Sequence, residues 1–456
     1  MKHASRLLLV LFLLAALLPA RTVSAQELLP TTDPICLSLA LPGGVAVSGS
    51  APSGSAFCIT VPPAAAITEL KGLVIFAHGY VFDYPAGLPP IIPYNQLALI
   101  DPATQTQTSI PAVVNGMGFV FATTSYSQNG LAVKEGVDNV VELVELVKQA
   151  VMVQFGLPAL PPFPVYIIGA SEGGLVTTLA VEKHPEVFSG GVATCGPVGD
   201  FVKQVNYWGD FRVLFDNYFP ANLLGDDPVT ITDDVMANWG SLGAPGPIMV
   251  DTLNLLQADL ASGGVNFQRL ITAGRAAVDP KAPESAIATT LGLLDYNVMA
   301  TNQAKVELGG NPYGNIGRLY VAHPFDLGLN RRVQRIAADP AALAEINAYY
   351  QTSGSLQRPL VLLHTTLDPI VPAWHMALYS AKAYKQHSLR QLVAIPIARY
   401  GHCAFTPAEA VFAFEVMLLK SARQNLSAAQ VQGALPDAGW RDSLKQLRVK
   451  FADQTK

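Results

Sequence analysis

Short apolar runs alternate with longer segments of helical periodicity along much of the chain. Leu73 to Ala77 and Val165 to Ile168 are nearly continuous apolar runs, as expected for strands buried on both faces of a sheet. Between them, valines at positions 137, 140, 141, 144, 147 and 151 recur at the spacing of one helical face, which predicts a helix over residues 134–155. This alternation predicts an α/β fold with a mostly parallel central sheet and helices on both faces.

The same reasoning predicts the remaining elements and the division of the chain. Further strands are expected at residues 56–63, 118–124, 188–194, 359–363 and 391–397, and further helices at 172–183 and 407–422. The segment from residue 201 to 355 is rich in helix-compatible stretches and separates the last two strands from the others. We therefore predict a core of residues 26–200 and 356–456, with a large, mostly helical cap at 201–355 inserted late in the sheet.

The first 25 residues have the pattern of a secretory signal peptide. Lys2 and Arg6 precede an apolar run from Leu7 to Leu18, and Val23-Ser24-Ala25 places small residues at a cleavage site. The run is shorter than the roughly 20 residues that span a bilayer, so we expect cleavage near Ala25 and no stable membrane anchor afterwards. The protein is expected to be secreted, to the periplasm or the extracellular space.

Net charge and cysteine content restrict the classes of function that the chain could have. Loss of the leader removes Lys2, Arg6 and Arg21 and changes the formal net charge from −5 to −8, which argues against a nucleic-acid partner. The cysteines form an even set of four, at positions 36, 58, 195 and 403. In an exported chain this predicts two disulfides, with three possible pairings. Neither a C-x-x-C pair nor an H-E-x-x-H helix occurs, so no metal is expected.

Ser171 is the candidate nucleophile. Gly169-Ala170-Ser171-Glu172-Gly173-Gly174 fits the pattern G-x-S-x-G between a predicted strand and a predicted helix. In that setting the serine lies on a sharp turn at the end of the sheet, and small residues on either side let other backbone come close. The alternative is a strand-to-helix turn whose serine only caps the helix.

Asp368 and His402 are the candidate acid and base. A serine hydroxyl needs a base to take its proton, and an acid must hold that base in one tautomer. Asp368 follows the predicted strand at 359–363, and His402 lies between the last strand and the last helix, in the order serine, acid, histidine. The alternative for Asp368 is a turn formed with Pro369. The other histidines are interpreted as structural or surface residues.

Two backbone NH groups are the candidate oxyanion donors. One belongs to Glu172, directly after the nucleophile, and the other to Tyr80, after His78-Gly79 at the end of the third strand. The His78 side chain is expected to hold this loop in place.

These motifs, in this order, resemble the α/β-hydrolase superfamily. The likeness covers roughly residues 56–200 and 356–425, and the Ser-Glu-Gly-Gly elbow is similar to that of secreted bacterial esterases and lipases. The resemblance implies a serine hydrolase that acts through an acyl-enzyme and needs no cofactor.

A partial likeness to tannases and feruloyl esterases concerns the cysteines. Those enzymes join a cysteine before the nucleophile to one after the histidine; here Cys403 follows His402, but Ala170 precedes Ser171. The substrate class of those enzymes is therefore not carried over. The likeness implies Cys195, at the end of the next strand, as the substitute partner of Cys403. Cys36 would then pair with Cys58.

The leading hypothesis is a carboxylic ester hydrolase for small or lipid-like esters. Aromatic residues gather at the start of the cap, and Trp208 and Phe215 are candidates for an acyl pocket, unless these rings only form the core of the cap. The alternatives are a serine peptidase of the prolyl-aminopeptidase type, with Glu172 holding the substrate's amino terminus, a polyester depolymerase, and a binding module without activity. The oligomeric state is not predicted.

Overall fold

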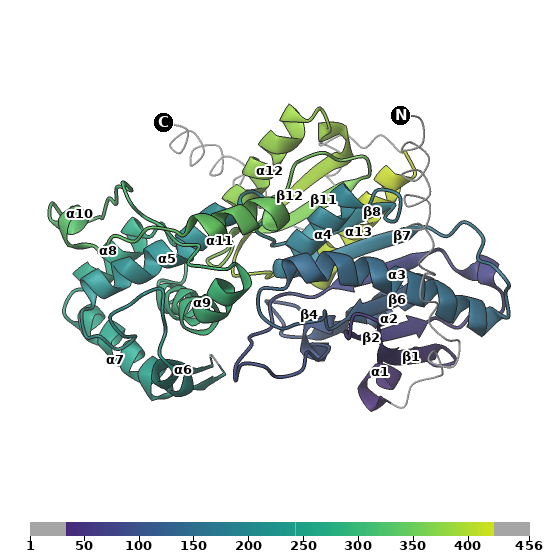
Figure 1. The fold of residues 1–456 in the computed structure, drawn as a ribbon, viewed down its shortest axis with the longest axis horizontal. Helices are drawn as coiled ribbons and strands as arrows, with labels where there is room; N and C mark the ends of the chain where they lie inside the picture. The colour runs from purple at the N-terminus through teal and green to yellow at the C-terminus, as the bar shows by residue number, and fades with distance from the viewer. Residues whose placement is uncertain (1–32, 242, 424–456) are drawn as a thin grey trace, which may run out of the picture.

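An eight-stranded, mostly parallel sheet forms the centre of the core (Figure 1). The computed structural model describes residues 33–241 and 243–423. The strand order is β1-β2-β6-β3-β7-β8-β11-β12. β2 pairs antiparallel with both β1 and β6, whereas all pairs from β6 to β12 are parallel. The predicted fold class is confirmed.

The elements of the core follow the predicted order. The strands of the sheet are β1 (Val45–Ser50), β2 (Ala56–Val61), β3 (Leu73–Ala77), β6 (Val120–Thr124), β7 (Val165–Ala170), β8 (Gly190–Thr194), β11 (Leu360–Leu367) and β12 (Leu392–Tyr400). The helices are α1 (Pro34–Ser38), α2 (Ile110–Gly116), α3 (Val133–Phe155), α4 (Glu172–Lys183), α12 (Trp374–Lys385) and α13 (Pro407–Ser421), with short 3-10 turns η2 (Ile67–Glu69), η3 (Tyr94–Leu97) and η5 (Leu389–Gln391). A small hairpin consists of β4 (Ala98–Ile100) and β5 (Gln107–Ser109).

β1 and the small hairpin were not predicted from the sequence. β1 lies in the Gly-, Ser- and Pro-rich segment before residue 56, which has little of the apolar alternation that indicates a strand. The strand forms because its backbone pairs with β2 at the edge of the sheet, where side-chain burial matters less.

Helices cover the sheet on both faces, which explains why the sequence of β3 is continuously apolar. Leu73 and Ile75 pack into a cluster with residues of α3, α4 and α12, whereas Val74 and Phe76 pack on the opposite face with residues of α2 and α13. All five residues of β3 are buried. The apolar run is thus explained by burial on both faces.

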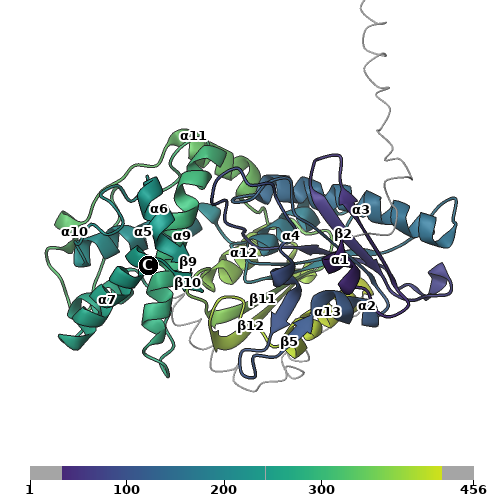
Figure 2. The same ribbon diagram turned by 90° about the horizontal axis from the view of Figure 1, so that it is seen from below.

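The cap lies between β8 and β11 and is mostly helical (Figures 1 and 2). It comprises α5 (Phe201–Tyr218), α6 (Asp233–Trp239), α7 (Pro247–Ala261), α8 (Val265–Ala273), α9 (Ser285–Glu307), α10 (Leu329–Arg332), α11 (Pro340–Glu345), the π-helical turn η4 (Ile346–Tyr350) and a short ribbon of β9 (Gly240–Ser241) and β10 (Ala244–Pro245). The cap has its own hydrophobic core, formed mainly by α5 to α9.

A buried arginine stabilises the centre of the cap. Arg212 is fully buried, and its guanidinium donates hydrogen bonds to Asp216, to Asn297 and to the carbonyls of Leu224 and Gly225. The nitrogens of the guanidinium group thus all have hydrogen-bond acceptors. Because Arg212 belongs to α5 and Asn297 to α9, these bonds fix the positions of the two helices relative to each other.

The predicted signal peptide lies outside the described residues. Among residues 33–241 and 243–423, none of the helices combines the length and the apolar character that crossing a bilayer would require.

The disulfide between Cys36 and Cys58 joins α1 to β2, in the predicted pairing, across a separation of 22 residues. Replacing both cysteines by alanine should lower the free energy of unfolding by about 3 kcal/mol, because the unfolded chain regains the freedom that the closed loop removes. Urea denaturation would measure this loss. Activity in the native state should not change; an inactive but equally stable variant would contradict this purely structural role.

Candidate active site

Ser171 lies on a sharp turn between β7 and α4. Its backbone adopts φ 56° and ψ −122°, in the left-handed region that non-glycine residues rarely occupy. The glycines on either side allow the turn: a Cβ on Gly169 would lie 2.2 Å from the carbonyl oxygen of Gly173, and a Cβ on Gly173 would lie 2.0 Å from that of Ala77. The G-x-S-x-G pattern therefore reflects close backbone packing around the serine.

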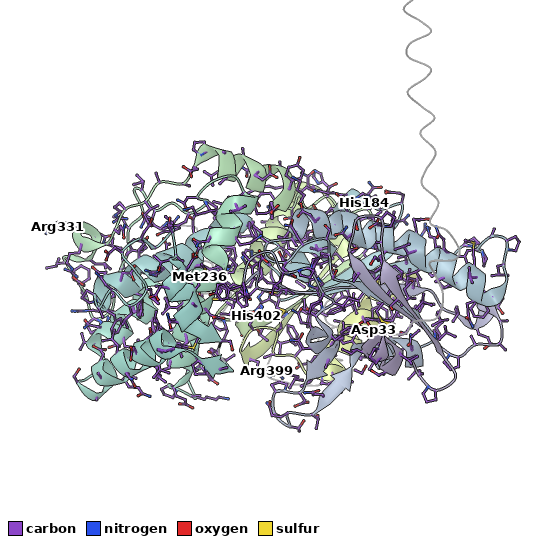
Figure 3. All side chains as sticks on the ribbon, turned by 60° about the horizontal axis from the view of Figure 1, so that its bottom comes forward. Asp33, His184, Met236, Arg331, Arg399 and His402 are labelled. Carbon is purple, nitrogen blue, oxygen red and sulfur yellow. A yellow bond between two sulfur atoms is a disulfide. The ribbon has the colours of Figure 1, made fainter. Side chains whose placement is uncertain are left out.

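The three residues predicted to act together meet at the ends of their strands. Nε2 of His402 lies 2.9 Å from Oγ of Ser171, and Nδ1 of His402 lies 2.7 Å from Oδ2 of Asp368. His402 lies where the cap meets the core (Figure 3). With Nδ1 donating to the carboxylate, Nε2 is free to accept the serine proton.

Asp368 is completely buried and remains ionised. Its Oδ1 accepts hydrogen bonds from the backbone NH groups of Ile370 and Val371, both at 2.9 Å. Burial alone would raise the pKa of Asp368, but His402 and His364 outweigh it and hold the pKa at about 2. No motif indicated that His364 supports the acid. Its Nε2 lies 2.7 Å from the carbonyl of Val371 and 3.5 Å from Asp368 Oδ2.

A disulfide holds the loop of His402. Cys195, directly after β8, is joined to Cys403, the pairing that the partial likeness to tannases and feruloyl esterases implied. The sulfur atoms of this pair lie near His402 with the spacing of metal ligands. Because both sulfurs are bonded to each other, the group acts as an anchor for the loop and offers no thiolate to a metal.

The His78-Gly79-Tyr80 loop packs directly on the elbow, where the predicted oxyanion donors would have to lie. A Cβ on Gly79 would lie 3.2 Å from Cβ of Ser171. Gln96 braces the loop, because its side chain accepts from the NH of Gly79 and donates to the carbonyl of Tyr80. Glu172 opens α4, so its NH belongs to the helix turn that has no intrahelical acceptor.

His78 has a structural role. Its ring stacks on Tyr126 at a centroid distance of 3.8 Å, and Nδ1 lies 2.7 Å from the carbonyl of Gly79. Burial lowers the pKa of His78 to about 4, so the ring is neutral at neutral pH and donates to this carbonyl.

An apolar pocket of about 890 Å³, including its open mouth, leads from Ser171 into the cap. Trp208 lines it, together with residues of α9 such as Ala300 and Ala304. Phe215 does not: it is 2% exposed, stacks on Phe219 in the core of the cap, and is absent from the pocket wall defined by the described residues. Phe215 lies seven residues after Trp208, about 10 Å farther along α5, beyond the pocket.

Tyr296 of α9 is a site residue that the sequence did not reveal. It lines the same pocket as Ser171, and its ring stacks on Trp208 at a centroid distance of 5.1 Å. Tyr296 occurs in no recognisable motif and lies in the cap, far from Ser171 in sequence. No sequence pattern indicated that this helix would reach the nucleophile.

The Glu172 side chain is buried beneath the elbow. It is 6% exposed, and its Oε1 accepts a hydrogen bond of 2.9 Å from the NH of Ala132. Burial raises the pKa of Glu172 to about 8, against the opposing effect of this hydrogen bond and with help from Glu135 and Glu307. The carboxyl group is therefore protonated at neutral pH.

This shift predicts a pH dependence of stability. The folded state keeps the Glu172 proton up to about pH 8, whereas the unfolded chain loses it above the ordinary value of 4.5, so this residue lowers stability as pH rises between these values. Glu172→Gln cannot ionise and still accepts from Ala132. Melting curves should show a variant similar to wild type at pH 4.5 and more stable by a few kcal/mol near pH 8.5.

The exposed Glu145 provides a control, because Glu145→Gln should keep the wild-type pH dependence. Parallel curves for wild type and Glu172→Gln from pH 4.5 to 8.5 would show that Glu172 is ionised in the folded protein.

Comparisons with known proteins do not identify a close relative. No model of a known protein family matches the chain, and no curated protein matches it in sequence. Feruloyl esterase B from Aspergillus oryzae is similar at 15% identity over 83% of this chain and 80% of that one, with a TM-score of 0.45. A rice cell wall degrading esterase from Xanthomonas oryzae is similar at 13% identity over 83% and 87% of the two chains, with a TM-score of 0.37.

An acylaminoacyl peptidase is similar at 11% identity and a TM-score of 0.39, over 84% of this chain but only 43% of the peptidase. With TM-scores below 0.5, these likenesses do not decide the activity. The order and direction of the strands, and the placement of a serine, an aspartate and a histidine at their ends, are those of the α/β-hydrolases. The chain therefore has the α/β-hydrolase fold.

Proposed function

We propose that this chain is a serine hydrolase that cleaves carboxylic esters through an acyl-enzyme on Ser171. The observation that carries the proposal is the continuous hydrogen-bonded chain from Asp368 through His402 to Ser171. It supplies a nucleophile, a base and a buried negative charge beside the base, as acyl transfer requires.

In the proposed reaction, Oγ of Ser171 attacks the ester carbonyl carbon while its proton passes to Nε2 of His402. The π electrons of the carbonyl move to its oxygen, where the NH groups of Tyr80 and Glu172 are proposed to donate. The bond to the alcohol oxygen then breaks, and His402 returns the proton to that oxygen. Water attacks the acyl group in the same way, the bond from carbon to Oγ breaks, and Oγ recovers its proton.

The shape and polarity of the pocket favour an apolar acyl group. The pocket that Ser171 lines is also lined by apolar side chains such as Leu131, Val205 and Trp208. Burial of such a wall against an alkyl or aryl chain is favourable by about 25 cal/mol per Å² of apolar surface. An apolar pocket that extends into the cap also fits a small or lipid-like ester better than a segment of a solid polyester.

The state of Glu172 argues against the aminopeptidase alternative. An aminopeptidase needs an accessible carboxylate for the substrate's ammonium group. The carboxyl group of Glu172 is buried and engaged by Ala132, and burial raises its pKa to about 8. Ester hydrolysis does not require an accessible carboxylate at Glu172. Ester hydrolysis is therefore preferred to aminopeptidase activity.

We also propose that the protein acts outside the cytosol. Two disulfides, Cys36–Cys58 and Cys195–Cys403, are typical of oxidising compartments. The sequence of the first 25 residues supports export through the secretory route.

Replacing Ser171 by alanine should reduce ester turnover at least about 10⁴-fold, because only binding and oxyanion stabilisation remain. His402→Ala should be nearly as severe and Asp368→Asn somewhat less so. The assay compares p-nitrophenyl esters with aminoacyl-naphthylamides, with Ser241→Ala on the exposed β9–β10 ribbon as a control that keeps full activity. A folded Ser171→Ala variant that retains most of its activity would refute the assignment, and faster cleavage of the amides would favour a peptidase.

Trp208 and Phe215 should behave differently, although both are aromatic residues of α5. Trp208→Ala should change the ratio of kcat/KM for octanoate and acetate esters several-fold, because it removes part of the pocket wall. Phe215→Leu should leave this ratio unchanged and lower the melting temperature, because it disturbs the buried core of the cap. The same ratio in wild type and Trp208→Ala would mean that the acyl chain lies elsewhere.

A further inference from the structure

One face of the cap helix α9 lies against residues next to His402 and Asp368 and lines the pocket at Ser171. Oγ1 of Thr289 lies 2.9 Å from the hydroxyl of Tyr400, two residues before His402. A Cβ on Gly292 would lie 3.1 Å from Cδ1 of Ile370, two residues after Asp368. Tyr296 lines the pocket that Ser171 also lines. Positions 289, 292 and 296 are spaced as one helical face, so this face is directed at the reaction centre.

The residues on either side of Tyr296 hold this face in position. Oδ1 of Asp295 accepts a hydrogen bond of 2.7 Å from Nε1 of Trp239, and Oδ1 of Asn297 accepts one of 2.7 Å from Arg212. Both side chains are buried in the interior of the cap. They fix the rotation of α9 about its axis, and with it the position of Tyr296 on the helix.

Three aromatic side chains confine the ring of Tyr296. Trp208 stacks on it almost in parallel, at an interplanar angle of 7°. Tyr80 and Phe82, from the loop after β3, approach its ring with centroid distances of 5.9 and 5.7 Å. A ring packed in this way has few alternative rotamers, so its hydroxyl is preorganised.

We propose that Tyr296 is a catalytic residue, a hydrogen-bond donor that the cap supplies to the reacting oxygen of Ser171. The proposal rests on the proposed serine hydrolase function and goes beyond it by making the cap a part of the catalytic centre. The cap then has two roles at Ser171, since Trp208 shapes the pocket and Tyr296 acts on the nucleophile.

The phenol would act without giving up its proton. While Oγ of Ser171 attacks the carbonyl carbon and its own proton moves to Nε2 of His402, the Tyr296 hydroxyl donates to the negative charge on Oγ. When the acyl-enzyme breaks down, the electron pair of the bond from carbon to Oγ returns to Oγ. His402 then delivers the proton and Tyr296 again only donates a hydrogen bond.

The surroundings of Tyr296 keep it in the donor form. Burial, followed by the charge of Asp295, raises the pKa of Tyr296 above that of a free phenol. The hydroxyl therefore carries its proton at neutral pH.

The decisive variant is Tyr296→Phe, which removes one oxygen and keeps the stacked ring. With p-nitrophenyl acetate, kcat should fall about 10²-fold while KM changes less than about twofold, because the lost interaction belongs to the transition state. The rate at which a fluorophosphonate labels Ser171, followed by mass spectrometry, should fall by a similar factor. The melting temperature should stay near that of wild type.

Tyr350→Phe is the matched control. Tyr350 is 1% exposed, and its hydroxyl has no hydrogen-bond partner among the described residues. Loss of this oxygen should leave kcat and the labelling rate unchanged. If the melting temperature of the Tyr296→Phe variant is lower than that of wild type, labelling is measured far below it, at a temperature where all of the variant is folded.

The outcomes separate this inference from the proposed function. A wild-type protein that labels at Ser171, with a Tyr296→Phe variant that labels and turns over within threefold of it, would overturn the role of Tyr296 alone. A large rise in KM with an unchanged kcat would also overturn it, because Tyr296 would then only bind substrate. A folded wild-type protein that neither labels at Ser171 nor cleaves esters would overturn the serine hydrolase function and the inference with it.

Discussion

The buried carboxylate of Asp368 is the interaction on which the rest of the site depends. It remains charged inside the protein because two backbone NH groups, His402 and His364 surround it. The cap holds the same loop from outside: Gln204 and Trp208 donate to the carbonyl of Ile370, and Tyr207 donates to that of Pro369. The first helix of the cap is therefore tied to the acid, and through it to the base and the nucleophile. Movement of α5 would disturb the geometry of all three.

The central sheet and the three residues at its strand ends could be predicted from sequence because local rules determine both. A strand buried on both faces is continuously apolar, as in β3 and β7, and the G-x-S-x-G turn needs glycine where neighbouring backbone passes within 3 Å of a Cβ, as at Gly169 and Gly173.

The cap could be recognised only as helical. Trp208 and Phe215 lie on the same face of α5, so their spacing in the sequence could not show which one lines the pocket. Only the position of each residue along the helix axis, relative to the pocket, distinguishes them. Tyr296 and Gln96 are brought to the site by tertiary packing, which leaves no pattern in the sequence. His364 is close to Asp368 along the chain, but no motif indicates that its ring lies beside the carboxylate.

The two acidic residues near Ser171, Asp368 and Glu172, differ in ionisation state because their surroundings differ. Asp368 is surrounded by donors and is held ionised, whereas Glu172, next to the nucleophile, has one donor and acidic neighbours and is held neutral at neutral pH. A neutral Glu172 keeps negative charge away from the place where an oxyanion would form, while the negative charge of Asp368 lies on the far side of His402, where it stabilises the imidazolium. Two carboxyl groups close to one serine thus serve opposite purposes, and their hydrogen-bond partners decide which is charged.

The most direct test of the account is the site of the acyl group during turnover. Wild-type protein mixed with p-nitrophenyl butyrate and quenched in acid within the first turnovers can be digested and mapped by mass spectrometry. The account predicts a butyryl group on the peptide that contains Ser171, formed in proportion to the first burst of p-nitrophenol and lost when the reaction continues before quenching. A butyryl group on another residue, or ester cleavage with no acylated peptide and no effect of Ser171→Ala, would contradict it.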